Sequence, residues 1–387
     1  MFLKMENLVK PAIEAVLGEN SEINLLNCSL SSNRSLTSNG GGAMYLNGGI
    51  FSIKSTSFTN NQATFQGGAI LISGASGSME DSNFTGNQNT NSNGGGALLI
   101  ENSSPSILRC RFIENSTSAN NHGGAIKLDT SSPIISDSYF VRNQSLVNSA
   151  GAVFIDSTSN PIFSNNEFHH NSAAQSAGAV FIQTGSNPIF SDNQFHSNIS
   201  SQSGGAIFID STSNPSFSKN EFRLNSAAQF GGAIFVNGSN LNLNGDLFLG
   251  NYANLGGGIA TQGTMSVSLS NVRALGNEAN SSSSSSAGFI YLNSGVTSST
   301  FVNSVFSGNK SLGRYGVYRP TGPSRFVNCS IVGNEAGTDG GVTLMFTGDS
   351  IELDNCIVWN IFFNNTSCTN YTLITNCNTF FNNRTTS

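Results

Sequence analysis

Residues 151–177 read GAVFIDSTSNPIFSNNEFHHNSAAQSA, and residues 178–204 repeat them nearly in step as GAVFIQTGSNPIFSDNQFHSNISSQSG. The same pattern recurs about every 27 residues along the chain. A Gly-Gly-Ala-Ile signal begins each copy, and a Phe-x-x-Asn signal follows it. A fixed period of this length is typical of solenoids, in which one small structural unit stacks on the next. The copies extend over nearly all of the 387 residues, so the repeat decides the fold.

Each copy is expected to contain three short strands, because its apolar residues occur in short runs separated by turn residues. In the copy that begins at Gly151 the runs are AVFID, PIFS and EFHHN. These runs are too short for helices, and the Asn, Gly and Ser between them favour turns. We therefore predict an all-β fold. Its architecture is a right-handed, single-stranded parallel β-helix of about 12–13 coils of about 27 residues, with three strands per coil.

Comparison of the copies predicts which side chains point inward. The positions of Val153 and Ile155 are apolar in the other well-formed copies, whereas the position of Phe154 between them holds Lys127 in one copy. Successive residues of a strand face opposite sides, so Phe154 should point outward. The Phe of each Phe-x-x-Asn signal should point inward, and its Asn should stack into an amide ladder. Stacking is needed because one coil cannot bury its own apolar face.

Two outward stripes are the candidate binding residues. An aromatic stripe would contain Phe154, Phe181, Phe208 and Phe235, beside an acidic stripe that includes Asp129, Asp156 and Asp210. Monomers rarely expose a contiguous apolar patch. The aromatic stripe would therefore either be shielded by a loop or another chain, or bind a protein or a glycan.

The acidic stripe leaves three interpretations open. Glu101, Asp129 and Asp156 would lie about 4.8 Å apart on adjacent coils, where like charges repel. Ca²⁺ could relieve that repulsion, a pair of carboxylates could act as a glycosidase acid and base, or these residues could simply end strands at the surface. Lys127 is the one basic residue beside the stripe in these copies. We expect a non-enzymatic protein with no catalytic residues, no cofactor and no metal. His169, His170 and His196 are expected to be surface imidazoles.

The cysteines are expected to be packing residues. Cys28, Cys110 and Cys329 share a small inward position two residues before the inward Phe position. Cys329 and Cys356 are one coil apart and could form a disulfide in an oxidising compartment. Cys368 and Cys377 could join them in a cluster that holds the irregular last coils, 325–387.

The ends of the chain and its charge limit the remaining possibilities. Residues 1–20 are expected to cap the first coil, with a short helix after Pro11, and residues 21–387 to form a single β-helix domain whose best repeats span 41–251. The N-terminus does not resemble a signal peptide, and no apolar run reaches the roughly 18–20 residues of a transmembrane span. The repeats run almost to the last residue, so we expect a fragment of a longer protein. A net charge of −6 disfavours nucleic acid as a partner.

The two signals together resemble the repeats of polymorphic outer membrane proteins, a family with a pectin-lyase-like β-helix fold. Gly-Gly-Ala-Ile stands at 67–70, 123–126, 204–207 and 231–234, and FTNN and FTGN stand at 58–61 and 84–87. The resemblance implies a secreted or surface-displayed passenger, associated with an outer membrane, that adheres to a protein or glycan on a cell surface. The alternatives are a polysaccharide-active β-helix enzyme that uses the acidic stripe, and a structural spacer within a larger surface protein.

Overall fold

A computed structural model describes residues 16–36, 40–91, 93–119, 122–283, 285–293, 295–319, 321–337 and 351–359, and the backbone alone of strands within 2–10 and 362–386. The chain is an all-β parallel solenoid of about 12 turns, without a helix in the described residues. Contacts divide it into two compact units, the N-terminal unit Met1–Ser201 and the C-terminal unit Gln202–Ser387. In the described part of the chain no helix is long and apolar enough to span a membrane.

Most coils contribute one strand to each of four parallel sheets, A to D, as the coil that begins at Gly151 shows. Its strands are β23 (Val153–Asp156) in sheet C, β24 (Ile162–Ser164) in sheet A, β25 (Glu167–His169) in sheet B and β26 (Ser172–Ala173) in sheet D. The first three confirm the predicted strands. The prediction of three strands per coil was wrong by one, because the segment after the closing Asn, expected to be a turn, forms β26. The backbone nitrogens of Ser172 and Ala174 donate to the preceding coil at 3.0 Å and make this short strand.

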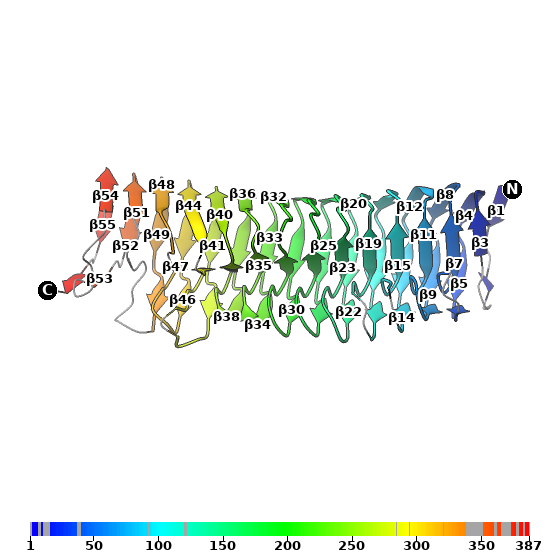
Figure 1. Cartoon of the computed structure of the whole chain (residues 1–387), viewed down its shortest axis with the longest axis horizontal. Coiled ribbons are helices and arrows are strands. Elements are labelled where there is room, and N and C mark those ends of the chain that lie inside the picture. Colours follow the sequence, from blue (N-terminus) through cyan, green and yellow to red (C-terminus); the bar gives the residue numbers. More distant parts are fainter. Residues whose placement is uncertain are drawn as a thin grey trace. The chain divides into compact units, whose positions relative to one another are not determined.

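In the N-terminal unit the strands of sheets A, B and C stack coil by coil (Figure 1). Sheet A contains β1 (Phe2–Glu6), β4 (Glu22–Leu26), β8 (Ile50–Lys54), β12 (Ser76–Glu80), β16 (Ser106–Leu108), β20 (Ile134–Ser136), β24 and β28 (Ile189–Ser191). Sheet B contains β2 (Val9–Lys10), β5 (Ser29–Ser31), β9 (Ser57–Thr59), β13 (Asn83–Thr85), β17 (Arg111–Ile113), β21 (Tyr139–Val141), β25 and β29 (Gln194–His196). Sheet C contains β3 (Val16–Glu19), β7 (Met44–Asn47), β11 (Ile70–Ser73), β15 (Leu98–Glu101), β19 (Ile126–Asp129), β23 and β27 (Val180–Ile182).

The C-terminal unit repeats the same arrangement. Sheet A contains β32 (Ser216–Ser218), β36 (Leu241–Asn244), β40 (Met265–Ser270), β44 (Val296–Val302), β48 (Ser324–Val327), β51 (Ile351–Asp354) and β54 (Leu373–Asn376). Sheet B contains β33 (Glu221–Arg223), β37 (Leu247–Leu249), β41 (Arg273–Leu275), β45 (Val305–Ser307), β49 (Ser330–Val332), β52 (Ile357–Trp359) and β55 (Thr379–Phe381). Sheet C contains β31 (Ile207–Ile209), β35 (Ile234–Asn237), β39 (Ile259–Gln262), β43 (Ile290–Leu292) and β47 (Tyr318–Arg319). The strands of sheet D in both units have two residues each, except β34 (Ser226–Phe230) and β38 (Tyr252–Leu255).

A stack of parallel phenylalanine rings runs through the interior of the N-terminal unit. Its members are Phe58, Phe84, Phe112, Phe140, Phe168 and Phe195, all fully buried. Their ring centroids are 4.7–4.9 Å apart and the rings lie within 2–7° of parallel. The spacing follows the distance between strands, so each ring packs on the ring of the next coil. The predicted inward direction of these residues is confirmed.

The predicted asparagine ladder lies beside this stack. Asn143 shows the pattern: its side-chain nitrogen donates to Asn171 Oδ1 at 3.0 Å and to the carbonyl oxygen of Phe112 at 2.9 Å. In the N-terminal unit the ladder contains Asn33, Asn61, Asn87, Asn115, Asn143, Asn171 and Asn198, and in the C-terminal unit Asn225, Asn251, Asn277, Asn309 and Asn334. Because every amide has a partner, the polar side chains can be buried without a desolvation penalty.

The corners explain why Gly, Asn, Ser and Asp are so frequent. The corner between sheets A and B places Asn27, Ser55 and Asp81 at φ 48–53°, a left-handed conformation that short polar residues and glycine tolerate best. Close approach of backbones requires glycine elsewhere: a Cβ on Gly151 would lie 2.1 Å from the carbonyl oxygen of Gly178 on the next coil. The glycine of each Gly-Gly signal is therefore a packing requirement.

The predicted N-terminal helix is wrong at its C-terminal end. Val16–Glu19 form strand β3, which pairs in parallel with β7. Val16 and Gly18 point into the coil, while Leu17 and Glu19 are exposed, so this segment alternates with the period of a strand. Residues 11–15, the remainder of the predicted helix, lie outside the described residues.

Candidate functional site

The four phenylalanines of the predicted aromatic stripe lie on sheet C and point away from the coil interior, as expected. Phe154 pairs with Phe181, and Phe208 pairs with Phe235, with ring centroids 5.5 and 5.0 Å apart. Phe154 and Phe235 are only 3% and 5% exposed, however, and Phe181 and Phe208 are half-buried. Of the two alternatives that the sequence left open for the stripe, shielding is therefore the one observed at Phe154 and Phe235.

Residues that precede the Gly-Gly turn cover sheet C from outside. In the N-terminal unit the His122 ring stacks on Phe154 at a centroid distance of 4.4 Å, and Lys127 Nζ lies 6.0 Å from the same ring. In the C-terminal unit a second hydrophobic cluster contains Phe235, Ala260, Ala287, Tyr291 and Tyr315, with Phe208, Phe230, Leu255 and Ala336 packed against it. The outward aromatic residues thus belong mainly to packing between sheet C and its covering loops.

Burial and charge shift the pKa of two groups in this region. Burial and the neighbouring charge of Lys127 lower the pKa of His122, which is therefore neutral over most of the physiological range. Burial raises the pKa of Glu101, Asp129 raises it further, and Lys127 opposes this effect. The Glu101 carboxyl is consequently easier to protonate than an ordinary glutamate side chain.

The acidic residues lie in the predicted register. Glu101 pairs with Asp129, and Asp129 pairs with Asp156, on consecutive strands β15, β19 and β23. The three aspartates accept hydrogen bonds at strand ends, two from the next residue and one from the next coil. Asp156 accepts from the Ser157 nitrogen at 2.7 Å, Asp129 accepts from the Thr130 hydroxyl at 3.1 Å, and Asp210 accepts from the Asn237 amide at 2.9 Å.

Neither the acidic stripe nor the histidines form a metal centre by geometry. Among the described residues, no three His, Cys, Asp or Glu side chains come together in a way that could hold a metal ion. The rings of His169 and His196 lie 5.4 Å apart, and His169 Nε2 lies 3.0 Å from Glu167 Oε2. Calcium binding by the acidic stripe thus rests on the register alone and stays one of the alternatives that the sequence leaves open.

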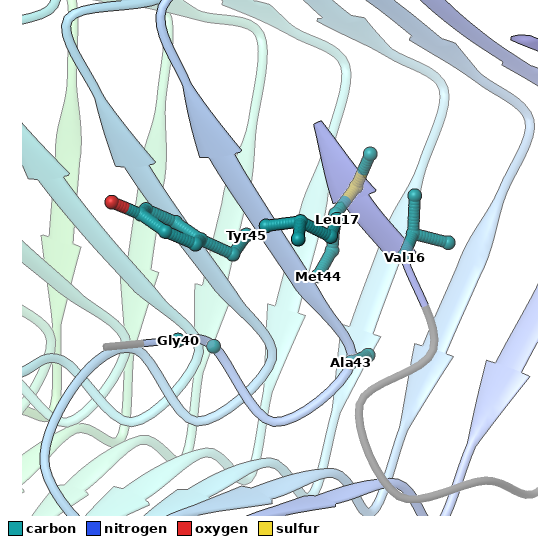
Figure 2. Close-up of a pocket in the computed structure, with 7 residues that line it drawn as sticks. Val16, Leu17, Gly40, Ala43, Met44 and Tyr45 are labelled. Carbon is teal, nitrogen blue, oxygen red and sulfur yellow. The ribbon is translucent and has the colours of Figure 1, made fainter. Parts of the chain in front are cut away.

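A small pocket lies at the first coils of sheet C (Figure 2). Val16, Leu17, Gly40, Gly41, Ala43, Met44 and Tyr45 line it. Its volume of about 30 Å³ would hold about one water molecule, far less than a sugar ring. Burial, together with the charges of Glu19 and Glu101, raises the pKa of Tyr45.

The cysteines occupy the small inward position that the sequence predicts. Cys28, Cys110, Cys329 and Cys356 are buried free thiols, and burial raises the pKa of Cys110 to about 12. The Cys329 backbone nitrogen lies 3.5 Å from Cys356 Sγ, and a hydrogen bond from the Cys329 thiol lowers the pKa of Cys356. The predicted disulfide is not formed in this structure, although the two residues are neighbours. Cys368 and Cys377 lie outside the described residues.

Sheet B of the C-terminal unit carries an apolar surface that the sequence analysis missed. Strands β37, β41, β45, β49 and β52 each bury their middle residue and turn the two flanking residues outward. Of these ten outward positions, seven are apolar: Leu247, Leu249, Leu275, Val305, Val332, Ile357 and Trp359. We call these seven residues the apolar strip. Ile357 is 47% exposed and Trp359 is 42% exposed.

The same face of the N-terminal unit begins differently. The outward residues of β5, β9 and β13 are all small and polar: Ser29, Ser31, Ser57, Thr59, Asn83 and Thr85. A shorter apolar column occurs there on sheet A, where Ile134, Ile162 and Ile189 pair in register and are 38–51% exposed. The sequence signal for the strip is the pair of residues that flank each inward Phe position. These differ between copies, so a search for repeated residues does not find them.

The sequence matches one family model, described as the right-handed β-helix region, over residues 13–174 and again over 111–274. The two matches together cover more than half of the chain. The chain belongs to the right-handed β-helix family. A search of curated proteins finds no match.

Membership of the right-handed β-helix family accounts for the interior of this protein. The phenylalanine stack, the asparagine ladder and the corner glycines are what any β-helix of this repeat needs in order to stack its coils. The outward residues are not fixed by that requirement. The stacking of coils therefore does not explain the apolar strip, which is the surface that most needs a functional explanation.

Proposed function

We propose that this β-helix is a non-enzymatic binding protein of the adhesin kind, secreted or displayed at a cell surface, that holds a protein or a glycan on an outer face. The apolar strip on sheet B of the C-terminal unit is the observation that carries this proposal. Exposed apolar patches of this kind on soluble proteins commonly mark interaction surfaces. The fold itself is consistent with surface proteins and with polysaccharide-related proteins.

The strip is not needed for stability of the coil. The buried residues between its members, such as Phe248, Ile331 and Val358, already fill the interior. Each fully buried side chain of this size contributes about 1.5–3 kcal/mol to stability, whereas a half-exposed outward residue contributes much less. Serine and threonine occupy the equivalent positions in the N-terminal unit without loss of the strand pairing. Apolar residues at these positions therefore serve something outside the chain.

The resemblance of the repeat signals to polymorphic outer membrane protein repeats supports a role in adhesion and an extracellular location. The sequence combines Gly-Gly-Ala-Ile and Phe-x-x-Asn signals in alternation over most of the chain. The buried asparagine ladder and the stacked rings give a rigid scaffold, and rigid elements hold a binding surface better than loops do.

The test compares two matched triple variants. One changes Leu249, Leu275 and Val332 of the strip to Ser, and the other changes Ile134, Ile162 and Ile189 of sheet A to Ser. Binding of each purified protein to cells and to a glycan array is measured, with circular dichroism to confirm the β fold. Binding that is lost in the strip variant and kept in the sheet A variant supports the proposal. Wild-type protein that binds no cell and no glycan would overturn it.

A second candidate function is hydrolysis or lytic cleavage of a polysaccharide at the acidic stripe. Its specific observation is the pairing of Glu101 with Asp129 on adjacent strands, together with the raised pKa of Glu101, because glycosidases use two neighbouring carboxyl groups of which the acid has a raised pKa. Release of reducing ends from a panel of polysaccharides, compared between wild type and Glu101→Gln, tests it. Release that is equal in both proteins would exclude Glu101 as the acid.

A further inference from the structure

We propose that the apolar strip binds an amphipathic α-helix of a partner protein, and that an acidic residue of this helix pairs with Arg273. The inference rests on the proposed binding function and names the partner class. Its three supports are the dimensions of the strip, its open edges and the isolated charge at Arg273.

The dimensions of the strip suit one helix. Strands β37, β41, β45, β49 and β52 pair in sequence, so five coils present their outward residues to the same side. Adjacent strands are about 4.8 Å apart, which gives about 19 Å from the first strand to the last. An α-helix of about 13 residues has this length, and its diameter of about 10 Å covers both outward columns. Apolar faces of parallel sheets are usually covered by helices.

The edges of the strip leave room for a helix to lie on it. The corner towards sheet D consists of Gly250, Gly276, Gly308 and Gly333. A Cβ atom at Gly276 or Gly333 would meet no atom of the described residues within 4 Å, so none of their side chains stands beside the strip at these two positions. The opposite corner carries short asparagines that bond to one another: Asn328 donates to Asn303 at 3.1 Å, and Asn355 donates to Asn328 at 2.8 Å. The surface is thus flat and accessible from above.

The positive charge of Arg273 indicates that the partner carries a negative charge at this position. Arg273 is exposed, is the one charged residue among the ten outward positions, and makes no ion pair with the described residues. Other arginines of the unit are paired: Arg223 donates to Glu221 at 2.6 Å, and Arg325 donates to Asp354 at 2.8 Å. A carboxylate on the partner would complete the strip. A second copy of the same face offers no carboxylate, which disfavours a symmetric dimer through this surface.

The chain has a convenient reporter for the test. Trp359 is the single tryptophan of the sequence and belongs to the strip, so burial under a helix should shift its fluorescence emission to shorter wavelength. The probe is a synthetic helix of about 18 residues, long enough to be partly helical in water, with a leucine face and one central Glu. A second peptide carries Lys in place of that Glu, and neutral phosphatidylcholine vesicles are tested in parallel.

The expected result has three parts. The Glu peptide shifts the Trp359 emission, and the Lys peptide binds about 5-fold more weakly, as expected for a partly exposed ion pair. The Arg273→Glu variant reverses this preference. Leu275→Ser weakens binding of the Glu peptide, while the matched outward substitution Ile113→Ser on β17 of the N-terminal unit leaves this binding unchanged.

Other results would overturn the inference of a helical partner, and they can be told apart from results that overturn the proposed binding function. Equal binding of the two peptides to wild type and to Arg273→Glu would exclude the charge pairing. A shift with the vesicles and none with the peptides would assign a membrane surface to the strip instead. If no peptide binds while cell or glycan binding still depends on the strip, the helix is wrong and the proposed function stands. If cell and glycan binding are absent as well, both fail.

Discussion

The side-chain nitrogen of Asn143 donates to Oδ1 of Asn171, one coil further along, at 3.0 Å. Asn143 Oδ1 in turn accepts from the backbone and side-chain nitrogens of Asn115 at 3.1 and 3.0 Å. Each asparagine of the ladder therefore satisfies buried groups on both neighbouring coils. A polar residue in the interior thereby contributes to stacking as directly as the phenylalanine beside it.

We expect Asn143→Ala to destabilise the protein by about 2–4 kcal/mol, because it removes the acceptor of the Asn115 backbone and side-chain nitrogens and the donor to the buried Phe112 carbonyl. The adjacent exposed residue provides the control, since Gln144→Ala should change stability by less than about 0.5 kcal/mol. Urea denaturation monitored by circular dichroism measures both. Equal midpoints for the two variants would show that the ladder does not stabilise the stack.

A substitution at Thr261 is expected to increase the stability of the protein. This residue occupies an inward position of sheet C between Val236 and Leu292 on the adjoining coils, and its buried hydroxyl has no hydrogen-bond partner. Thr261→Val keeps the shape and removes the unsatisfied group, so it should stabilise the protein by about 1 kcal/mol. Thermal denaturation measures the effect.

Thr56 is the matched control for this substitution. Its hydroxyl donates to the Lys54 carbonyl at 2.9 Å and accepts from the Cys28 nitrogen at 3.4 Å. Thr56→Val should therefore lower the melting temperature, whereas Thr261→Val raises it. A loss of stability in both variants would mean that the Thr261 hydroxyl has a partner.

The interior of this β-helix could be predicted from sequence because inward positions repeat with the coil. The positions of Val153 and Ile155 hold apolar residues in copy after copy, and each side chain of a strand can point only inward or outward. The fourth strand could not be predicted in this way. Ser172–Ala173 is only two residues long, too short for an alternating pattern, and its strand character comes from bonds to the neighbouring coil.

The outer surface was less predictable, because it depends on residues outside the period. The direction of Phe154 follows from alternation, but its burial depends on His122, a residue of the covering loop that the other copies do not share. Likewise Phe230 covers Phe235 in a single copy. The apolar strip was detectable in principle from pairs such as Leu247 and Leu249, which flank Phe248 where Ser57 and Thr59 flank the inward Phe of an earlier copy.

The burial of His122 predicts a loss of stability on acidification. Its folded pKa is below the unfolded value of 6.5, so the unfolded chain binds more protons and stability falls as the pH drops below about 6.5. The loss levels off once the pH is below the folded pKa. His122→Asn should flatten this part of the stability profile, as measured by urea midpoints at pH 7.5, 6.5 and 5.5.

The pKa of Glu101 is raised, whereas that of His122 is lowered, and the two groups affect stability in different pH ranges. Its folded pKa is raised above the unfolded value of 4.5, so its contribution to stability is present below about pH 4.5 and is lost as the pH rises through the folded pKa. Glu101→Gln should therefore stabilise the protein at neutral pH relative to acid pH. For His122, an equal loss of stability on acidification in wild type and in His122→Asn would show that another group causes the loss.

The close approach of coils at the Gly-Gly signal predicts a position-specific effect of alanine. In Gly151→Ala the new Cβ would lie 2.1 Å from the Gly178 carbonyl oxygen and 2.6 Å from the Ser172 nitrogen, and both are backbone atoms that cannot rotate away. The coils would have to separate, so we expect a loss of at least about 3 kcal/mol and increased proteolysis near this coil. Gly276→Ala is the contrast, because Gly276 has φ +61° but open space around a Cβ. It should cost only the about 1–2 kcal/mol of a left-handed alanine. If the two variants unfold at the same urea concentration, the glycines recur along this chain because of the backbone conformation that they allow and not because of the close approach of coils.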